Sequence, residues 1–498
     1  PALGAPSGRL ASNTWRFLVI WFVLRLHSKL TICIIAASAP PLHISRMNEA
    51  APIAETRIKK APKDKRIAVI GAGACGLCAA KYLTQAGLDV TIFEIGTQIG
   101  GMWCYENDNQ RSSAYRTLHI NTSRDVTRFH DFDFDPDVQF FPDHRDMHKY
   151  LVKYAQHFDI AKRIRYNARV KDVRPLFDPM TEPPLWALEF EDGSTEEYDA
   201  VIAATGHLSV PMHVPMFKDE FKGEYLHAHY YREPEPYVGK RICIIGVGNS
   251  ACDISGDICA TAKRCVLVAR SGVLILPKLL FGMPFTDITR KIQRSWIPGG
   301  IRRRATRFLT WLAHGSMTKL GFKPMDSRAH VTSNGTIVTD IAYSRIEVKQ
   351  GIEKIEGQTI HFVDGTAEEF DTLIAATGYL IDLPFISRDI VPLDDNRLDL
   401  FKRMTRPDWP GLYLMGFFNL DSALNMVYEY QARWVRDIEL GEAKIPSAIE
   451  MKADIKRKSD WVKKYYRDSS RHTIEEEHVP YIRELKKSLK AMRRAAGN

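Results

Sequence analysis

The sequence predicts an α/β fold made of two similar strand–turn–helix–strand modules in tandem. Three observations support this prediction. A glycine-rich turn follows the apolar run at residues 66–70, and a second turn of the same kind follows residues 241–245. Further along the chain, each module gains a buried strand that ends in Ala-Thr-Gly, at Thr205 and at Thr377. An acidic turn precedes each of these strands, and the repeat of the whole pattern is more specific than either glycine turn alone.

The first module begins with Arg66–Ile70, which is short, apolar and rich in β-branched residues, as in a buried strand. A tight turn follows from Gly71 to Gly76. Residues Ala79–Ala86 then predict a helix that ends at Gly87, and Val90–Glu94 predict the next strand. This order of elements is a βαβ unit.

The turn of the first module has the residues that a dinucleotide needs. Gly71 makes the turn, Gly73 lets the backbone approach a pyrophosphate, and Gly76 allows the helix to pack closely on the strand. The free N–H groups and the dipole of the helix N-terminus stabilise phosphate charge. Glu94, at the end of the second strand, can accept hydrogen bonds from a ribose diol and would repel a 2′-phosphate. We therefore expect FAD or NAD here, not NADP.

The second module repeats the pattern with one informative difference. Its turn runs from Gly246 through Gly248 to Ala251, which replaces the third glycine, and a helix and a strand over Cys265–Ala269 follow. Where the first module has an acid, this strand is followed by Arg270 and Ser271. A cation and a hydroxyl suit the 2′-phosphate of NADP. One module without a 2′-phosphate and one with it predict FAD together with NADPH.

Composition narrows the class of protein. The chain has 498 residues, of which 45% are hydrophobic, so it can bury a large core. Its net charge of +9 is modest and is spread along the chain, and no recognition motif accompanies it, so we expect no nucleic-acid partner. Most of the eight cysteines fall within expected strands and helices, which indicates buried, reduced thiols. Cys75 and Cys78 have the redox CxxC spacing, but they lie in the phosphate turn and are interpreted as helix packing.

Three segments lie outside the repeated pattern. The apolar stretch Phe17–Leu24 is too short and too soon interrupted by charge to span a membrane, and we interpret it as a mis-assigned start or an unstructured extension rather than a signal or anchor. The basic, aromatic insert at 274–333 predicts one or two amphipathic helices over the active site, with a membrane-surface role for "RRRATRFLTWL" as the alternative. The tail predicts a solvated, charged helix, with a lipid or partner contact as the less favoured alternative. The expected domains are a possibly non-native extension at 1–60, an FAD-binding domain at 61–211 and 380–446, an NADPH-binding domain with a helical insert at 212–379, and the tail at 447–498.

Several stretches together resemble the flavin-containing monooxygenase family. "FKGEYLHAHYY" matches the family fingerprint F-x-G-x-x-x-H-x-x-x-[YF] at Phe221, Gly223, His227 and Tyr231. "EIGTQIGGMW", "YRTLHINTSR", "GNSACD", "FDTLIAATGYLIDLPF" and "NMVYEYQARW" match further family segments. The resemblance covers roughly residues 66–434 and leaves out the N-terminal extension, much of the insert and the tail. It implies two Rossmann-like modules, the NADPH module being inserted into the FAD module.

The resemblance also implies a reaction. In this family NADPH reduces FAD, the reduced flavin forms a C4a-hydroperoxide with O2, and a soft nitrogen or sulfur nucleophile takes one oxygen atom. NADP⁺ stays bound and shields the intermediate from water. Asn121 would be the active-site asparagine and the catalytic residue, and its uncharged carboxamide supplies no acid that would break the intermediate down. We accordingly expect O2 and a small amine or sulfide as partners, no association with membranes, a homo-oligomer and a cytoplasmic location.

The residues that we expect to bind the two cofactors are spread over both modules. For FAD they are Gly71, Gly73, Ala74, Cys75, Gly76, Glu94, Gly101, Met102 and Trp103. Asn121 and Thr122 are also expected to bind cofactor, and Asn121 could hold the nicotinamide ribose and support the peroxyflavin. For NADPH they are Gly246, Gly248, Asn249, Ser250, Ala251, Asp253, Arg270 and Ser271.

Three other functions compete with this prediction. A Baeyer–Villiger monooxygenase shares the architecture and oxygenates ketones, but its fingerprint usually ends in Trp where this chain has Tyr231. A pyridine-nucleotide–disulfide reductase would need Cys75 and Cys78 as a redox pair. A non-catalytic flavin-binding protein would hold FAD without turning over NADPH.

No metal site is expected. The alternating acids at residues 131–137 lack the central glycine and the closing glutamate of an EF-hand, so we interpret them as an exposed strand or loop. His227 and His229 are two residues apart but have no further ligands nearby in the sequence, and the resemblance gives His227 a structural role between the two modules.

Overall fold

The computed structural model describes residues 60–179, 181–293, 296–325, 331–466, 470 and 472–497. All of them belong to one compact unit, Thr56–Asn498. The predictions for the stretch Phe17–Leu24 and for almost all of the extension at 1–60 lie outside the described residues.

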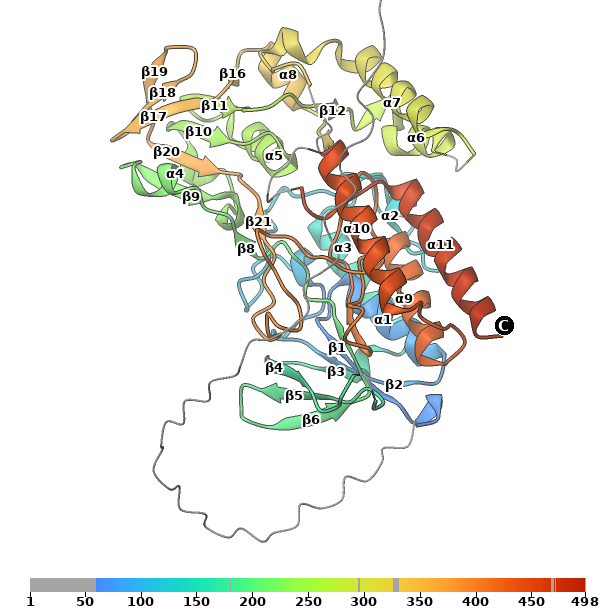
Figure 1. Cartoon of the computed structure of the whole chain (residues 1–498). Helices are drawn as coiled ribbons and strands as arrows, with labels where there is room; N and C mark the ends of the chain where they lie inside the picture. Colours follow the sequence, from blue (N-terminus) through green and yellow to red (C-terminus); the bar gives the residue numbers. More distant parts are fainter. Residues whose placement is uncertain are drawn as a thin grey trace, which may run out of the picture. The chain divides into compact units, whose positions relative to one another are not determined.

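The first glycine turn belongs to a five-stranded parallel sheet (Figure 1). The strand order is β22–β7–β1–β2–β3. The bounds are β1 Arg66–Ile70, β2 Asp89–Phe93, β3 Ile164–Arg165, β7 Ala200–Ala203 and β22 Leu412–Leu414. Helix α1 (Ala74–Gln85) connects β1 to β2. The central strands are continuous apolar runs because helices and loops cover both faces of the sheet.

The second glycine turn belongs to a second five-stranded parallel sheet, in the order β16–β11–β10–β20–β9. The bounds are β9 Glu224–His227, β10 Arg241–Ile245, β11 Arg264–Val268, β16 Glu347–Lys349 and β20 Thr372–Ala375. Helix α5 (Asn249–Ile258) connects β10 to β11, and α8 (Ile337–Ala342) packs against α5. The two sheets therefore repeat one design, as the sequence predicts.

The connectivity confirms the predicted fold class. Strand β22, which follows the whole second sheet in the chain, pairs in parallel with β7 of the first sheet, so the second module is inserted into the first.

Each module also has a three-stranded antiparallel sheet just before its Ala-Thr-Gly strand. These are β4 Val170–Pro175, β5 Trp186–Phe190 and β6 Thr195–Tyr198 in the first module, and β17 Ile352–Glu356, β18 Thr359–Phe362 and β19 Ala367–Glu369 in the second. The acidic turns recognised in the sequence connect the last two strands of each.

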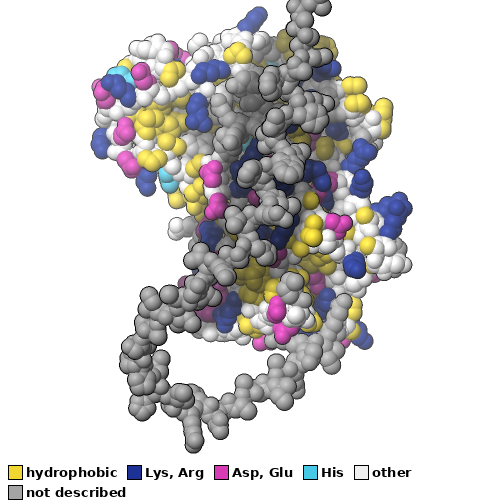
Figure 2. Space-filling view, in the orientation of Figure 1, with side chains coloured by type: hydrophobic (Ala, Val, Ile, Leu, Met, Phe, Trp, Pro, Cys, Tyr) yellow, Lys and Arg dark blue, Asp and Glu magenta, His cyan; other side chains and the backbone are white. Residues whose placement is uncertain are grey.

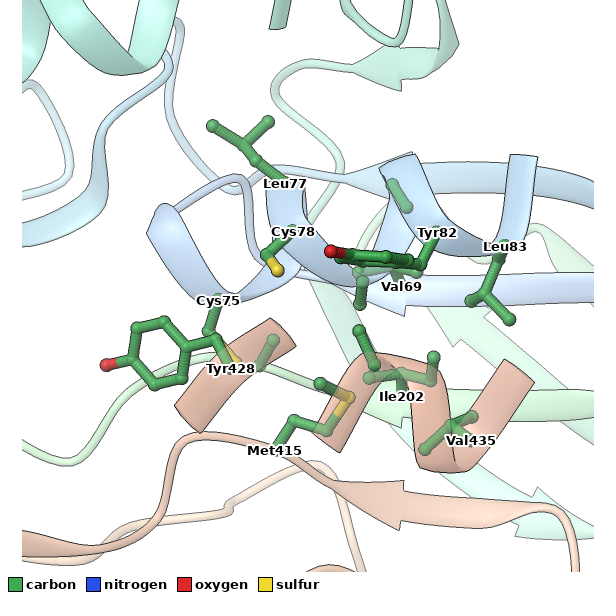
Figure 3. Packing of buried hydrophobic residues seen from close by; sticks show 14 of the residues in the cluster. Val69, Cys75, Leu77, Cys78, Tyr82, Leu83, Ile202, Met415, Tyr428 and Val435 are labelled. Atoms are coloured by element: carbon green, nitrogen blue, oxygen red, sulfur yellow. The ribbon is translucent and has the colours of Figure 1, made fainter. Parts of the chain in front are cut away.

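Helix α1 begins at Ala74, so the predicted start at Ala79 was wrong. Gly76 and the two cysteines are poor helix formers, but the first turn of the helix lies on the sheet and packing overrides propensity. On its other side α1 packs against α9 (Asn425–Glu439). Figure 3 shows the side chains of this core, including Cys75, Cys78 and Tyr428.

The insert is helical, as predicted. Its helices are α6 (Phe285–Ile292) and α7 (Gly299–His314), and short strands flank them: β12 Ile275–Leu276, β13 Leu279–Leu280, β14 Met283–Pro284 and β15 Thr332–Ser333. Helix α6 lies against α2 (Arg124–Thr127) of the first module. Among the described residues, no helix combines the length and the apolar character that crossing a bilayer requires. On the face shown in Figure 2, Lys and Arg side chains are interspersed with Asp and Glu.

The prediction of a solvated tail helix was wrong. The tail forms α10 (Ala448–Tyr465), the short strand β24 (Glu475–Glu476) and α11 (His478–Ala495). Strand β24 pairs with β23 (Asn419–Leu420), and α11 packs against α9 (Figure 1). Tyr481, Leu485 and Met492 on one face of α11 are buried in the core of the first module.

Candidate functional site

The first glycine turn leaves no room for larger side chains. Gly71 has φ +108°, a backbone conformation that favours glycine, and an added Cβ would lie 2.8 Å from the carbonyl oxygen of Ala204. A Cβ on Gly76 would overlap the carbonyl oxygen of Gly71. The turn is therefore closed tightly against the strand β7, as the prediction for these two residues requires.

Gly73 is different, because a side chain could be added there without a clash. It is the N-cap of α1, with φ −80° and no side-chain cap, so the first N–H groups of the helix, at Ala74 and Cys75, are free to bind an anion. An added Cβ would meet only the Cα of Gly101, at 3.8 Å. The protein itself does not require glycine at this position, whereas a pyrophosphate approaching the backbone does.

The predicted flavin loop lies against this turn. Gly101–Trp103 forms a short 3-10 helix, and the preceding Gly100 donates its N–H to the carbonyl of Ala72 at 3.1 Å. The Ser112 hydroxyl donates to the carbonyl of Met102 at 2.7 Å. These contacts bring Gly101, Met102 and Trp103 to the glycine turn.

Glu94 is buried just after β2 and holds the same turn. One carboxylate oxygen accepts the N–H of Ala72 at 2.9 Å, and the other accepts the N–H of Gly96 at 2.9 Å. The oxygen that accepts Gly96 also accepts the Asn109 amide at 3.4 Å. A carboxylate oxygen has two lone pairs, so the oxygen that accepts Ala72 can take one more hydrogen bond. Glu94 therefore organises the turn itself, and its contact with a ribose diol stays a prediction.

The structure argues against the disulfide reductase. The seven cysteines among the described residues are free and buried. Burial raises the pKa of both Cys75 and Cys78 well above that of an ordinary thiol. Such thiols stay protonated, and a protonated thiol is a poor nucleophile in thiol–disulfide exchange. Cys75 instead packs near Gly416, where an added Cβ would lie 3.1 Å from its sulfur.

The second glycine turn repeats the geometry of the first. Gly246 has φ +119°, and an added Cβ would lie 2.6 Å from the carbonyl oxygen of Ala376. Gly248 is the N-cap of α5 without a side-chain cap, so the first turn of α5, which contains Asn249, Ser250 and Ala251, has N–H groups free for a phosphate.

Arg270 lies two residues beyond the end of β11, the strand next to the one that leads into the glycine turn. Its side chain is exposed, and among the described residues it has no hydrogen-bonding or ionic partner. Ser271 beside it is half-buried. In parallel sheets, ligands bind at the carboxyl ends of the strands. A free guanidinium and a hydroxyl at this edge fit the predicted 2′-phosphate.

Asp253 has a different environment from the one expected. One carboxylate oxygen accepts the Tyr115 hydroxyl at 2.8 Å, and the other accepts the Asn334 amide at 2.7 Å. Burial raises the pKa of Asp253, although the nearby ammonium of Lys278 opposes the shift. Asp253 therefore connects the two modules through Tyr115, and its contact with a cofactor stays a prediction.

The predicted catalytic segment is held by the insert. Lys278 donates to the carbonyl of Ile120 at 2.7 Å and to the side-chain oxygen of Asn121 at 3.0 Å. The hydroxyl of Ser333 donates to the backbone carbonyl of Asn121 at 3.3 Å. The hydroxyl of Thr122 forms a hydrogen bond with that of Thr127 at 2.6 Å. Sequence reasoning missed Lys278 and Ser333, because neither belongs to a local motif.

Ser333 also contacts the second glycine turn. Its N–H donates to the side-chain oxygen of Asn249 at 2.9 Å, and the neighbouring Thr332 hydroxyl donates to the carbonyl of Val247 at 2.7 Å. Ser333 therefore hydrogen-bonds both Asn121 of the first module and Asn249 of the second, and so bridges the two. This arrangement joins the two predicted cofactor sites at the predicted catalytic residue.

The histidine-rich stretch is structural. His227 ends β9 and accepts the N–H of His229 at 3.1 Å. Burial, together with His213 and His229, lowers the pKa of His227 to about 4, so its ring is neutral at physiological pH. Tyr231 donates to Asp257 at 2.5 Å. His229 approaches the carbonyl of Gln110, in the first module, at 3.3 Å.

One group of metal-type side chains occurs elsewhere among the described residues. His130, Asp131 and Glu429 place ligand atoms within 4.8 Å of one another. However, Lys81 forms an ion pair with Asp131, and Arg433 lies 3.4 Å from the His130 ring. These two cations already balance the acids and would repel a metal ion. The acidic stretch at 131–137 is a loop, one of the two predicted forms.

Cavity size alone does not identify the site. A cavity of about 800 Å³ lies between α10 and α11, and neither glycine turn lines it. Its walls carry paired charges, among them the ion pairs of Lys402 and Lys458 with Glu484. A second cavity of about 430 Å³ is lined by Lys278, Asp253 and Asn334.

Comparison with known proteins agrees with this geometry. The model of the flavin-binding monooxygenase-like family matches residues 64–494. The match includes the insert and most of the tail, so the range of 66–434 recognised from motifs was too short. Flavin-containing monooxygenase 5 of Homo sapiens is 30% identical over 448 residues, covering 84% of this chain and 82% of that protein. Dimethylaniline monooxygenase [N-oxide-forming] 2 of Rattus norvegicus is 28% identical over 445 residues, with the same coverage.

Solved structures share the fold. S-allyl-L-cysteine S-oxygenase from Allium sativum superposes with a TM-score of 0.65 at 23% identity, covering 86% of this chain and 88% of that one. Cyclohexanone monooxygenase from Rhodococcus sp. Phi1 bound to NADP⁺ superposes with a TM-score of 0.61 at 16% identity, covering 86% and 98%.

Proposed function

The chain belongs to the flavin-binding monooxygenase-like family, and on this premise we propose that it uses FAD and NADPH to oxygenate soft nitrogen or sulfur nucleophiles. When bound and reduced by NADPH, the flavin would supply the oxidising chemistry, the activation of O2 for the transfer of one oxygen atom. The residues of the chain bind the cofactors, orient them and exclude water. A homo-oligomeric state and a cytoplasmic location stay predictions.

The observation that carries this proposal is the pair of uncapped helix N-termini, at Gly73 and Gly248, with Asn121 held between the modules. Each N-terminus suits a pyrophosphate. Glu94 disfavours a 2′-phosphate at the first site, and Arg270 favours one at the second. Ser333 hydrogen-bonds both Asn121 and Asn249. NADPH bound at the second site, as the hydride donor, would therefore lie next to the segment that we assign to the flavin.

The substrate class follows from relatives and from the fingerprint. One relative is named an N-oxide-forming dimethylaniline monooxygenase, and a protein of the same fold is named an S-oxygenase. Tyr231, the last fingerprint residue, favours this group over the ketone-oxygenating one. We therefore propose amines and sulfides as substrates and keep ketones as the competing class.

The reaction is tested with purified, flavin-loaded protein. The enzyme is reduced with NADPH, mixed with O2 and followed by flavin absorbance, and N,N-dimethylaniline, S-allyl-L-cysteine and cyclohexanone are then offered in parallel. We expect an oxygenated flavin spectrum that decays faster with the amine or the sulfide. Turnover of cyclohexanone alone would assign the chain to the Baeyer–Villiger class. Flavin binding without NADPH oxidation would refute an enzymatic role.

Asn121 is tested by Asn121→Ala. The loss of one buried hydrogen-bonding group costs about 1 to 3 kcal/mol, so we expect the ratio of product to NADPH consumed to fall by about tenfold. Gln139→Ala is the matched control, because it removes an exposed carboxamide from the same segment. Equal coupling in the wild type and in Asn121→Ala would remove Asn121 from the site.

A further inference from the structure

Among the described residues, the only hydrogen bond to the Asn121 carboxamide comes from Lys278. It lies in the insert between β12 and β13, and its ammonium group reaches the first module to bond the carbonyl of Ile120 and the side-chain oxygen of Asn121. The side chain is half-buried, with the ring of Phe141 5.1 Å from the ammonium.

The chemistry of the pair determines which way the carboxamide points. A protonated lysine has three N–H donors and no acceptor, whereas a carboxamide has one acceptor oxygen and one donor nitrogen. The Asn121 atom that faces Lys278 must therefore be the oxygen. The two N–H groups of Asn121 then remain for whatever lies on the other side. Without a charged donor beside it, the carboxamide could rotate by half a turn and present its oxygen instead.

We propose that Lys278 is a positioning residue, which fixes the orientation of the Asn121 carboxamide so that this side chain presents donors to the reacting groups. The proposal rests on the function proposed above. Donor N–H groups favour an acceptor such as a ribose hydroxyl oxygen or a peroxide oxygen, and a carbonyl oxygen in the same place would repel it. Coupling of NADPH oxidation to oxygenation would therefore depend on a residue outside the glycine turns.

Burial and the nearby Asp253 set the pKa of Lys278. Asp253 and Asp257 of α5, together with His119 of the first module, line the same 430 Å³ cavity. Tyr115 and Asn334 bond Asp253 from two further segments. Burial lowers the pKa of Lys278 to about 8, although Asp253 opposes this shift. Above that pH the amine is neutral and gains a lone pair, so it can accept an N–H of Asn121 and no longer selects one orientation.

The side chain and the backbone of Asn121 are held by different residues. Ser333 bonds its backbone carbonyl, and Arg290 of α6 bonds the backbone carbonyl of Asp125 at 3.3 Å in the same segment. Removing Lys278 therefore frees the carboxamide while these backbone contacts persist. Arg290→Ala provides the matched control, because it removes a cationic contact from the same insert without touching Asn121.

The test compares flavin-loaded wild type, Lys278→Met, Lys278→Arg and Arg290→Ala between about pH 6.5 and about pH 9.5, on either side of the lysine pKa. The first readout needs no turnover: the affinity for NADP⁺, measured from the change in absorbance of the oxidised flavin. The second is the ratio of N-oxide formed from N,N-dimethylaniline to NADPH consumed.

In the wild type and in Arg290→Ala we expect both readouts to fall as the pH rises through about 8. Lys278→Met should lack this step, and its coupling should be about tenfold below that of the wild type at the low end of the pH range, because a charge-assisted hydrogen bond contributes about 1.5 to 3 kcal/mol. Above the lysine pKa the two proteins should converge. Lys278→Arg should keep coupling at high pH, because a guanidinium stays protonated up to a pH above about 12.

A Lys278→Met enzyme with the wild-type pH step and wild-type coupling would overturn the proposal. If that variant does not fold, the absence of a pH step near 8 in the wild type, or its persistence in Lys278→Arg, overturns it equally. A wild type that oxygenates nothing refutes the proposed function instead, and the NADP⁺ affinity profile then still decides the role of Lys278.

Discussion

Gly73→Ala separates a glycine that the fold needs from a glycine that the cofactor needs. Gly73 has φ −80°, which alanine adopts without strain, and an added Cβ would meet only the Cα of Gly101 at 3.8 Å, an ordinary van der Waals distance. Alanine is a less favourable N-cap than glycine, which lowers stability, but it makes the unfolded chain less flexible, which raises stability. These effects nearly cancel, so we expect the free energy of unfolding of the flavin-free protein to change by less than about 1 kcal/mol.

On our proposal, the same methyl group would occupy the space through which the pyrophosphate approaches the backbone. If it displaces one or two charge-assisted hydrogen bonds, each contributing about 1.5 to 3 kcal/mol, FAD affinity falls by roughly tenfold to a thousandfold or more. Gly76→Ala should behave in the opposite way. Its Cβ would overlap the carbonyl oxygen of Gly71, so it should destabilise the flavin-free protein itself, by about 1 to 3 kcal/mol or more.

The assay has two parts. Urea unfolding of flavin-free protein gives stability without the contribution of bound ligand, and quenching of flavin fluorescence on titration gives the dissociation constant of FAD. Gly300→Ala in α7, where an added Cβ meets no atom within 4 Å, controls for glycine replacement as such. Wild-type FAD affinity in Gly73→Ala, or a loss of stability equal to that of Gly76→Ala, would refute the assignment of Gly73 to the cofactor.

Two further predictions concern charge. Arg270→Ala should raise the KM for NADPH by about tenfold and leave the KM for NADH nearly unchanged, because only NADPH has the 2′-phosphate. Equal effects on the two coenzymes would contradict the assignment of Arg270 to the 2′-phosphate. Burial alone would raise the pKa of Glu484, but Lys458 and Lys402 together lower it to about 2. The stability that this carboxylate contributes is therefore present above pH 4.5 and is lost as the pH falls toward 2. Acid unfolding followed by circular dichroism should show a smaller loss over that interval in Glu484→Gln than in the wild type, and identical profiles would exclude the ion pairs as the cause.

The parts of the fold that depend on local chemistry could be predicted from the sequence. The strand Arg66–Ile70 was predicted to the residue, because an apolar, β-branched run leads directly into the turn at Gly71. The start of α1 was missed because intrinsic propensity disfavours a helix at Gly76, and only the sheet beneath it makes the first turn stable. The side of α11 that contains Tyr481 and Leu485 is buried, yet the many lysines and arginines around it indicated a solvated helix.

The candidate site divides in the same way. Glycine turns, Glu94 and Arg270 belong to motifs in which spacing carries the chemistry, so sequence alone was enough to propose them. Lys278 meets Asn121 across 157 residues of chain, and Ser333 meets it across 212. No periodicity or composition links such positions, because their contact arises only when the insert packs on the first module.

Insertion of one module into the other also sets the order of events during synthesis. Strand β22 pairs with β7 only after the ribosome has made the entire second sheet, because Leu412 lies opposite Val201. The second module is therefore complete while the apolar edge of β7 is still uncovered, and an unpaired edge of this kind invites pairing with another chain. A newly made chain passes through a stage in which one nucleotide site can be occupied and the flavin sheet still lacks its outer strand. Chaperone demand and flavin loading should accordingly depend on how quickly the last ninety or so residues emerge.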